Sequence, residues 1–291
     1  MLLRIVAILF PLFAIVAVGF VVGRRKRPDL TQANQLNMDV FVPALVFAAL
    51  AGKPFRPEND IPLLLATLAL VAGSGLAGWA LARATGIAPK TLVPPLMFNN
   101  CGNLGLPLAV LAFGEAALAP MVVMFMVSNL AHFSFGAWLL DHKVRLMTLW
   151  KVPSVMATFA GLAVGMSGVA LWEPLLLSIR MLGEISIPLM LFALGVRLSD
   201  SRITSIRLGV FGAAMRPLMC MAIAGVLLML FDFPPLQQAL VLTFGALPPA
   251  VLNYIFAERY HQEPEKVASM VLIGNLGAVV FLPIALAFVL P

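Results

Sequence analysis

Long runs of apolar residues alternate along this chain with short connections rich in charged residues, glycine and proline. Ten of these runs hold about 20 residues each, which is enough for a helix to cross the hydrocarbon core of a bilayer. They occupy residues 2–23, 33–52, 60–83, 92–113, 119–140, 152–171, 175–197, 206–230, 235–257 and 266–290. The pattern therefore predicts an all-α polytopic membrane protein with ten transmembrane helices, and its short connections leave no room for a soluble domain.

The overall composition agrees with this pattern, because 62% of the 291 residues are hydrophobic, 11% are charged and the mean hydropathy is +1.01. Such a chain has too little polar surface to cover a soluble globule. The basic cluster Arg24 to Arg27 follows the first apolar run, so we expect a retained helix there and not a signal peptide. Cys101 and Cys220 fall within spans and match neither a disulfide framework nor a metal site.

The basic residues are distributed unevenly between the two ends of the predicted spans. If the N-terminus lies outside, the outer ends carry only Arg4, Lys53 and Arg56. The cytoplasmic ends then carry Arg24, Arg25, Lys26, Arg27, Arg83, Lys90, Lys143, Arg145, Lys151, Arg197, Arg202, Arg207, Arg259 and Lys266. The positive-inside rule predicts both termini on the non-cytoplasmic side of a bacterial inner membrane. The net charge of +6 then reflects topology and does not indicate a nucleic-acid partner.

The two halves of the chain repeat one plan at an offset of 145 residues. Asp39 stands four residues before Pro43, and Glu184 stands four residues before Pro188. Each half contains an odd number of spans, so the second copy is inverted in the membrane relative to the first. We therefore predict a first repeat at 1–140, a cytoplasmic linker at 141–151 and a second repeat at 152–291.

Both repeats interrupt one span with residues that disfavour a regular helix. Proline removes a helical hydrogen bond, and glycine raises the entropic cost of helix formation. Backbone groups freed in lipid must find partners in protein, water or ligand, so such a segment must be buried or line a cavity. In the fourth and ninth spans, the predicted substrate-binding residues are Asn99, Asn100, Asn103, Gly105, Pro107, Pro248, Pro249 and Asn253.

Matched broken helices in inverted repeats are the sequence pointer to a secondary transporter with its site near the bilayer midplane. Two half-helix N-termini would face that site with their positive dipole ends, so an anionic ligand is expected. One kinked span would mean little, because glycine and proline are common in membrane helices. The matched placement of the two breaks is what favours transport.

Ionisable and amide side chains within the predicted spans are candidates for coupling transport to an ion gradient. Asp39 and Glu184 are equivalent under the repeat, and a desolvated carboxylate can carry a proton, although both also lie near enough to a helix end to reach water. His132 titrates in a suitable range, but a single histidine is more often a packing residue. The other candidates are Asn129, Asn275 and Arg216, for which interhelical hydrogen bonding or snorkelling is the simpler alternative.

The sequence lacks the motifs of enzymes and primary pumps. It holds no His-Glu-x-x-His, no phosphate-binding loop with Lys-Ser/Thr and no evident Ser/His/Asp set. We therefore expect no enzymatic activity, no cofactor and no bound metal. Uphill transport would then depend on the membrane potential or on a gradient of H+ or Na+ as the coupling ion.

Three stretches of this chain resemble the auxin efflux carrier family, and within it the bacterial members described as malonate transporters. They are residues 99–108, 187–195 and 248–254. The resemblance implies ten helices in two inverted five-helix repeats, as in bile-acid symporters and sodium/proton antiporters. It also implies a scaffold of spans 1, 2, 6 and 7 and a mobile domain of spans 3 to 5 and 8 to 10.

The resemblance further implies a substrate site where the fourth and ninth spans cross, at Asn103, Pro107 and Pro248 or Pro249, and a homodimer formed through the scaffold. The long cytoplasmic loop of plant auxin carriers is missing, so auxin itself becomes a weak substrate prediction. We expect a secondary active transporter of small organic anions, mono- or dicarboxylates such as malonate, in the inner membrane.

Two alternatives remain open at the level of sequence. A sodium-coupled symporter of the bile-acid type shares the expected fold, and Asn99, Asn100, Asn103 and Asn129 with unwound carbonyl groups would supply oxygen ligands for the ion. A membrane sensor or channel that reuses the fold belongs to a different functional class. A channel would show conductance without substrate counterflow.

Overall fold

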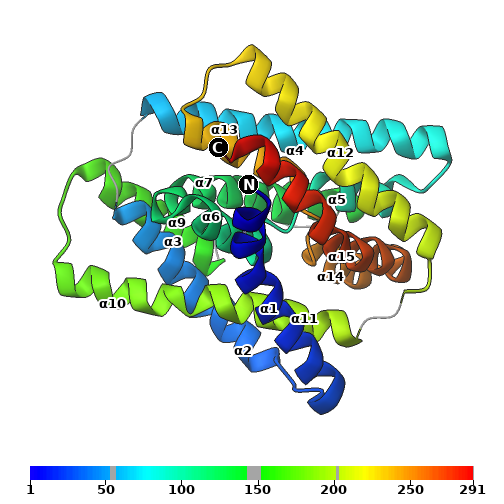
Figure 1. Cartoon of the computed structure of the whole chain (residues 1–291), viewed down its shortest axis with the longest axis horizontal. Helices are drawn as coiled ribbons and strands as arrows, with labels where there is room; N and C mark the ends of the chain where they lie inside the picture. The colour runs from blue at the N-terminus through cyan, green and yellow to red at the C-terminus, as the bar shows by residue number, and fades with distance from the viewer. Residues whose placement is uncertain (53–56, 143–151, 201–202, 291) are drawn as a thin grey trace.

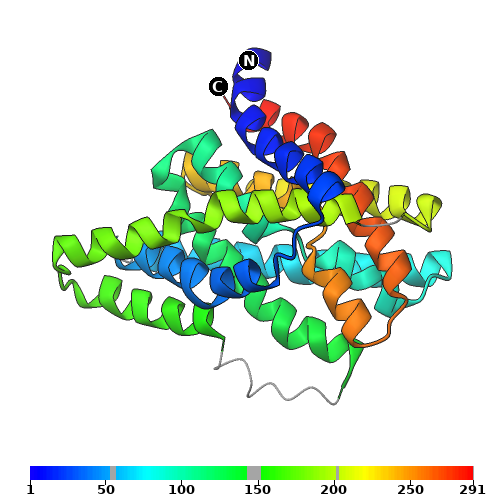
Figure 2. The same cartoon turned by 90° about the horizontal axis from the view of Figure 1, so that it is seen from below.

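The computed structural model of the chain is built from helices, and it describes residues 1–52, 57–142, 152–200 and 203–290. Among these residues the β contacts are limited to one isolated bridge, and no strand is formed. The first and last helices, α1 (Leu2–Lys26) and α15 (Pro264–Val289), pack against each other. The two chain ends lie near one another on the same side of the molecule (Figures 1 and 2).

Seven helical stretches of the described chain are long and apolar enough to cross a membrane. They are Leu2–Lys26, Thr31–Ala51, Asp60–Thr85, Glu115–Leu140, Glu173–Ser199, Ile206–Leu230 and Pro264–Val289. Two shorter apolar helices, Cys101–Phe113 and Pro153–Ser167, are also present. These lengths and compositions are those of a multi-pass membrane protein.

Three spans predicted from the sequence contain shorter helices. The span predicted at 152–171 contains α9 (Pro153–Ser167), which ends where Gly168 adopts a left-handed conformation with φ of 67°. The spans predicted at 92–113 and 235–257 are each interrupted near the middle. Their parts are α5 (Pro89–Met97), the π-helical turn η2 (Cys101–Gly105) and α6 (Leu106–Phe113), and then α13 (Pro235–Ala246) and α14 (Leu252–Arg259).

The helices pack into two groups. In the first group, α1 lies along α11 (Ser186–Asp200), and α3 (Val42–Ala51) lies against α9 and α10 (Glu173–Glu184). In the second group, α12 (Ile206–Leu230) packs on α4 (Pro57–Thr85), α13 and α15, while α4 also contacts α5 and α7 (Leu118–Ala131). Contacts between the groups involve chiefly η2, α6 and α7 of the second group with α1, α3 and α11 of the first.

Glycines allow the first group to pack backbone against backbone. A Cβ atom at Gly19 would lie 2.2 Å from the carbonyl oxygen of Phe192, and one at Gly195 would lie 2.0 Å from that of Val16. A Cβ atom at Gly183 would lie 2.6 Å from the backbone of Leu45. Small residues of this kind let membrane helices approach closely, so α1, α3, α10 and α11 form a tightly fitted unit.

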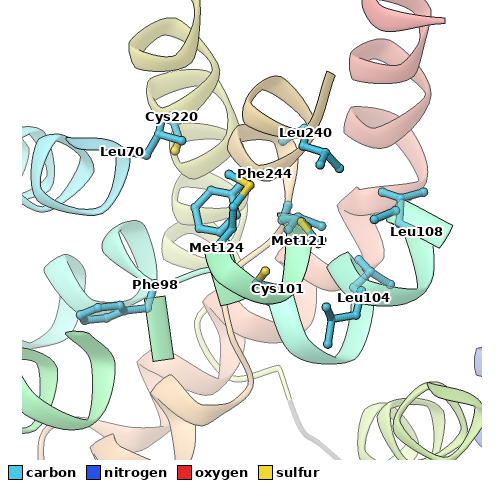
Figure 3. Close-up of a cluster of buried hydrophobic side chains, with 14 of the residues drawn as sticks. Leu70, Phe98, Cys101, Leu104, Leu108, Met121, Met124, Cys220, Leu240 and Phe244 are labelled. Carbon is cyan, nitrogen blue, oxygen red and sulfur yellow. The ribbon is translucent and has the colours of Figure 1, made fainter. Parts of the chain in front are cut away.

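The second group surrounds a dense apolar core beside the two helix breaks (Figure 3). Leu70 of α4, Cys220 of α12 and Phe244 of α13 are each at most 1% exposed, and Met121 of α7 is fully buried. Leu104 of η2 belongs to the same cluster. The broken spans are therefore anchored in close-packed protein on one side, as non-helical backbone at membrane depth requires.

Candidate functional site

The two broken spans cross and bind each other through their backbones. Asn99 and Pro249 form an antiparallel bridge. On either side of it, the Asn100 amide donates to the Pro248 carbonyl at 2.8 Å, and the Ala250 amide donates to the Phe98 carbonyl at 3.0 Å. This pair of hydrogen bonds is symmetric, because Phe98 with Pro248 and Asn100 with Ala250 each stand 150 residues apart.

The symmetric pairing differs by five residues from the 145-residue offset read from the sequence. That offset pairs Asn99 with Phe244, and in the structure these two residues are instead donor and acceptor of a hydrogen bond, with Asn99 Nδ2 at 2.8 Å from the Phe244 carbonyl oxygen. The offset changes because α13 has 12 residues and α5 has 9, so the second break comes later in its repeat.

Asparagine side chains occupy the carbonyl groups that the breaks release. Asn253 Nδ2 donates to the Phe98 carbonyl at 3.1 Å. Asn275 Nδ2 donates to the Pro249 carbonyl at 3.1 Å, and its Oδ1 accepts from Asn100 Nδ2 at 2.8 Å. These amides therefore satisfy two carbonyls at the crossing, those of Phe98 and Pro249, as non-helical backbone at membrane depth requires.

Arg216 lies on the far side of the crossing, in the middle of α12. The side chain is fully buried, and its Nη1 donates to the carbonyl of Gly245 at 2.7 Å, in the last turn of α13. The Cys220 thiol lies beside the guanidinium. A cation at the C-terminal end of a helix is attracted to the negative end of the helix dipole, so Arg216 stabilises the second break. Arg216 does not line the cavity on the other side of the crossing.

A central cavity of about 290 Å³ lies on the other side of the crossing, between the two helix groups. Six of the nine asparagines in the chain line it, and the first turns of both half-helices, at 101–103 and 250–252, form part of its wall. The asparagines are Asn34, Asn37, Asn99, Asn100, Asn103 and Asn129. The first amide groups of a helix have no acceptor within that helix, so these turns present donors to the cavity.

Every π-helical turn of the described chain contributes to this cavity. The turns are η1 (Asn37–Phe41), η2 and η4 (His132–Gly136), and they supply Asn37, Asn103 and His132 to the lining. Single π turns within α-helices occur frequently at functional sites, because the extra residue per turn re-aims side chains. Three such turns around one cavity make it the strongest candidate site in the structure.

Arg197 lies between the central cavity and a wider space of about 680 Å³, which we call the vestibule. Asn34, Ala193 and Arg197 line both spaces. The vestibule lies where α1 joins α2 (Thr31–Leu36), α11 joins α12 and α14 joins α15, which we call the basic end. Tyr254 and Glu258 of α14 lie near the half-buried Arg197, and the Tyr254 hydroxyl donates to Glu258 at 3.3 Å.

The carboxylates proposed for coupling lie away from the central cavity. Glu184 is exposed and lines a separate cavity of about 370 Å³ at the opposite end, together with Glu115 and Arg180. Asp39 is exposed on η1 and lines none of the cavities described here. Neither side chain therefore reaches the candidate site in this structure.

His132 is built into the wall of the central cavity. Its ring stacks on Phe98 with 4.1 Å between centroids and meets the edge of Phe256 at 5.1 Å. Asn253 lies beside it, and Nε2 has no hydrogen bond to another described residue. The imidazole thus contacts Phe98, whose carbonyl accepts hydrogen bonds from Ala250 and Asn253 at the crossing.

The predicted site residues fall into three sets. Asn99, Asn100, Asn103, Asn129 and His132 line the central cavity. Gly105, Pro107, Pro248, Pro249, Asn253, Asn275 and Arg216 are buried within or behind the crossing. Asp39 and Glu184 lie elsewhere, and the sequence did not single out Asn34, Asn37, Ser128 and Arg197, which also line the cavity. The π turns are the local feature that sequence reading missed.

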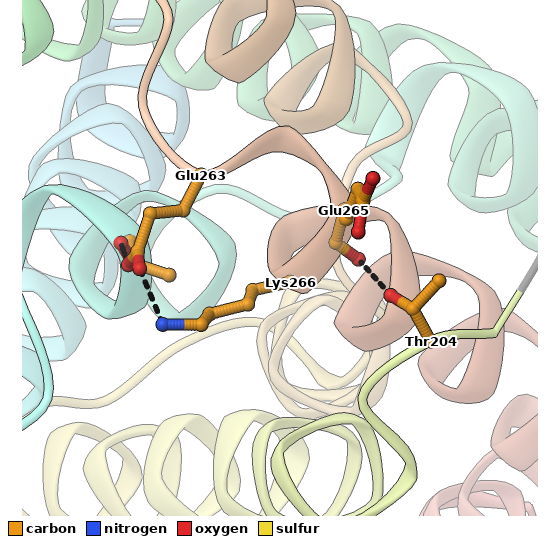
Figure 4. A network of polar contacts seen from close by, with 5 residues as sticks. Thr204, Glu263, Glu265 and Lys266 are labelled. Atoms are coloured by element: carbon orange, nitrogen blue, oxygen red, sulfur yellow. Dashed lines mark hydrogen bonds and ion pairs between the residues drawn. The ribbon is translucent and has the colours of Figure 1, made fainter.

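A polar cluster ties the helices together at the basic end. Glu263, just before α15, accepts hydrogen bonds from Lys266 and from Thr91 of α5. These two donors hold the pKa of the Glu263 carboxyl below its usual range. Ser269 of α15 accepts from the Thr204 amide at 3.2 Å, and Figure 4 shows Thr204 reaching the Glu265 carbonyl. Within the described residues, no group of His, Cys, Asp and Glu side chains is arranged to hold a metal ion.

Comparison with known proteins gives two matches. The sequence profile of the family described as "Membrane transport protein" matches residues 138–286, just over half of the chain. A protein of Rhizobium meliloti (strain 1021) named "Putative malonate transporter" is 23% identical over 298 residues, which cover 94% of this chain and 92% of that protein. The family match contains the second broken span and Arg197.

Proposed function

Since this chain belongs to the auxin efflux carrier family of membrane transport proteins, we propose that it is a secondary active transporter of small organic anions, mono- or dicarboxylates such as malonate. The observation that carries this proposal is the central cavity, which lies between two separately packed helix groups and shares Asn34, Ala193 and Arg197 with the lining of the vestibule. The name of the Rhizobium meliloti relative supports malonate as the first compound to test.

The lining of the cavity suits a carboxylate. Arg197 offers a charged donor at the mouth, and the first turns of both half-helices offer backbone amides and positive dipole ends. The asparagines add neutral polar groups that can replace part of the hydration shell of the anion. Half-helix N-termini that point at the midplane are an arrangement that transporters use to receive anionic groups.

We further propose ten spans in two inverted five-helix repeats, with the two crossed helix pairs counted as the fourth and ninth. The symmetric hydrogen bonds at the crossing support an inverted relation between the two breaks. The tightly fitted group of α1, α3, α9, α10 and α11 would be the scaffold, and the group around the crossing would move against it. The cavity then opens alternately to either side of the membrane.

The remaining sequence expectations become part of this proposal. The basic end, with Arg197 and Arg207, faces the cytoplasm of a bacterial cell, and both termini lie on the non-cytoplasmic side of the inner membrane. The protein works as a homodimer joined through the scaffold. We take H+ or the membrane potential as the driving force, with Na+ as the alternative that the transport assay tests.

Counterflow of labelled malonate in proteoliposomes, with no ion gradient, tests the proposal. We expect saturable exchange in sodium-containing and in sodium-free buffer. Arg197→Gln should reduce exchange about 10- to 100-fold, because it removes a hydrogen bond to a charged group worth about 1.5–3 kcal/mol. Arg207→Gln is the matched control, since Arg207 is exposed at the same end but lines a different cavity.

The other outcomes have defined meanings. Exchange that requires sodium would replace proton or potential coupling with the sodium symporter alternative. Conductance without counterflow would indicate a channel. An absence of malonate, acetate and succinate exchange in both buffers, with the protein folded, would contradict the carboxylate proposal.

A further inference from the structure

Arg216 is a buried positive charge without a negative partner in the described chain. Its side chain is fully buried in the middle of α12. Nη1 donates to the Gly245 carbonyl, but Nε and Nη2 have no hydrogen bond to another described residue. No described Asp or Glu forms an ion pair with it, and the Cys220 thiol beside it is uncharged. A charge removed from water is costly unless another charge compensates it, so the guanidinium leaves one positive charge to be balanced.

The helix ends at the crossing do not supply this balance. The negative ends of α5 and α13 lie there, at Met97 and Ala246. The positive ends of the two half-helices lie there as well, at Cys101 and Leu252. Each end is equivalent to about half a charge, so the four ends largely cancel. Arg216 therefore sets the net charge of the crossing.

Arg216 lies close behind the wall of the central cavity. Its charge acts on Cys101, which lines the cavity in the first turn of η2. Arg216 binds the carbonyl of Gly245, and the preceding carbonyl, of Phe244, accepts from Asn99 in the cavity wall. Cys101 and Phe244 are each 1% exposed and belong to one buried cluster (Figure 3). Protein with little water separates the guanidinium from the cavity, so its charge is weakly screened there.

From these observations we propose that Arg216 is the fixed counter-charge of the transported anion, and that it acts through the wall of the cavity without touching the ligand. This inference rests on the proposed carboxylate transport. An anion in the cavity compensates the buried guanidinium, and a neutral molecule of the same shape does not. Arg216 is thus a positioning residue that selects ionised ligands over neutral ones.

The size of this effect follows from Coulomb's law. At an effective dielectric constant of about 20, the attraction between unit charges about 10 Å apart changes a dissociation constant by about tenfold. A ligand with two carboxylates gains this factor twice, and a neutral ligand gains nothing. A change in the shape of the crossing would instead affect all ligands alike. The dependence of affinity on ligand charge is therefore the property that Arg216 controls.

Cys220 offers a way to cancel this charge without altering Arg216. Cys220→Asp puts a carboxylate beside the guanidinium, which favours its ionised form, and Cys220→Asn is a matched control of similar shape without the charge. Malonate, malonamate and malonamide share one carbon skeleton and carry two, one and no negative charges at mildly alkaline pH. Their dissociation constants are measured in detergent from the shift that each ligand causes in the thermal unfolding midpoint.

We expect Cys220→Asp to weaken malonate by about 100-fold and malonamate by about tenfold relative to Cys220→Asn, and to leave malonamide unchanged. Cys220→Asn should keep the wild-type dependence on ligand charge. Arg216→Gln should weaken the two anions as Cys220→Asp does, and Arg216→Lys, which keeps the charge, should restore most of their affinity. Without ligand, Cys220→Asp should unfold at no lower temperature than Cys220→Asn, because its carboxylate pairs a buried charge.

Failure of the inference is distinguishable from failure of the proposed function. Equal losses for malonate and malonamate in Cys220→Asp would show a structural effect and overturn the counter-charge, as would no loss for either anion. Unfolding of Cys220→Asp under conditions where Cys220→Asn folds would overturn the unpaired charge. If neither Cys220 variant folds, the same comparison of the two anions in Arg216→Lys and Arg216→Gln decides. Malonate counterflow by wild type keeps the carboxylate proposal intact in all these cases, and its absence would contradict the proposed function.

Discussion

The two breaks at the crossing reach the same backbone geometry with different chemistry. At the first break, Asn99 and Asn100 supply side-chain amides to Phe244 and Asn275. The second is built on prolines, whose nitrogens cannot donate; the carbonyls of Pro248 and Pro249 accept, and the donors to the first break come from the residues that follow, Ala250 and Asn253. Each break is thus complete only in the presence of the other, and equivalent positions in the two repeats do not have equivalent roles.

The largest expected effect separates residues that line the cavity from residues that build the crossing. Asn103 lines the cavity, and its side chain holds no other part of the crossing by a hydrogen bond among the described residues. Asn103→Ala should therefore abolish malonate counterflow while changing the thermal unfolding midpoint in detergent very little. Normal transport by this variant would remove the first break from the binding site.

A smaller effect is expected when the two breaks are compared by the free energy of unfolding that each loses on substitution. Asn99→Leu leaves the buried Phe244 carbonyl without its donor and should reduce the free energy of unfolding by about 1–3 kcal/mol. Pro249→Ala keeps the carbonyl that accepts from Asn275, so we expect a loss of less than about 1 kcal/mol. Equal losses, measured by thermal unfolding of the two variants side by side, would contradict the division into donors and acceptors.

Asp39 and Glu184 are carboxylates at equivalent positions of the two repeats. Both are exposed and outside the central cavity. Asp39→Asn and Glu184→Gln should each change malonate exchange by no more than about twofold, which corresponds to the ±0.5 kcal/mol typical of surface substitutions. Loss of the pH dependence in either variant would return that carboxylate to the coupling mechanism.

The smallest effect concerns the attachment of the first broken span at the basic end. Glu263 accepts from Thr91 and Lys266, and these bonds lower its pKa from the ordinary value of 4.5. A lowered folded pKa means that the contribution to stability is complete above that ordinary value and is lost as the pH falls through the folded pKa. Wild type should be slightly more stable than Glu263→Gln at neutral pH, and a gap that persisted in strong acid would contradict this origin.

The two helix breaks could be predicted from the sequence, because amides, glycines and prolines in an apolar span disfavour a regular helix, whereas their crossing was implied only by the family resemblance. Asn99, Asn100, Asn103, Asn129 and His132 could be named for the same reason. The register of the breaks could not be predicted. Pro89 and Pro235, which begin α5 and α13, are 146 residues apart, close to the 145-residue offset of the repeats. Because α13 is longer than α5, the residues that pair at the two breaks are 150 residues apart.

Arg197 could not be recognised from the sequence for a different reason. Its place near the end of an apolar span is typical of a residue that marks the cytoplasmic interface. It becomes part of the candidate site only because α2 and α14, distant in sequence, complete the vestibule around it. Asn34 and Asn37 depend in the same way on the packing of α2 and η1, so tertiary structure decides their role.

The bridge between Asn99 and Pro249 also sets an order of events during synthesis. The first break leaves the ribosome 150 residues before its partner, an interval on the order of ten seconds at the usual rate of translation. During that time, three donors near Asn100 stand in or beside the bilayer without their final acceptors, and the Phe98 carbonyl stands there without its donors. The newly made first half therefore depends on the insertion machinery, or on trapped water, to shelter a segment that only the finished chain can close.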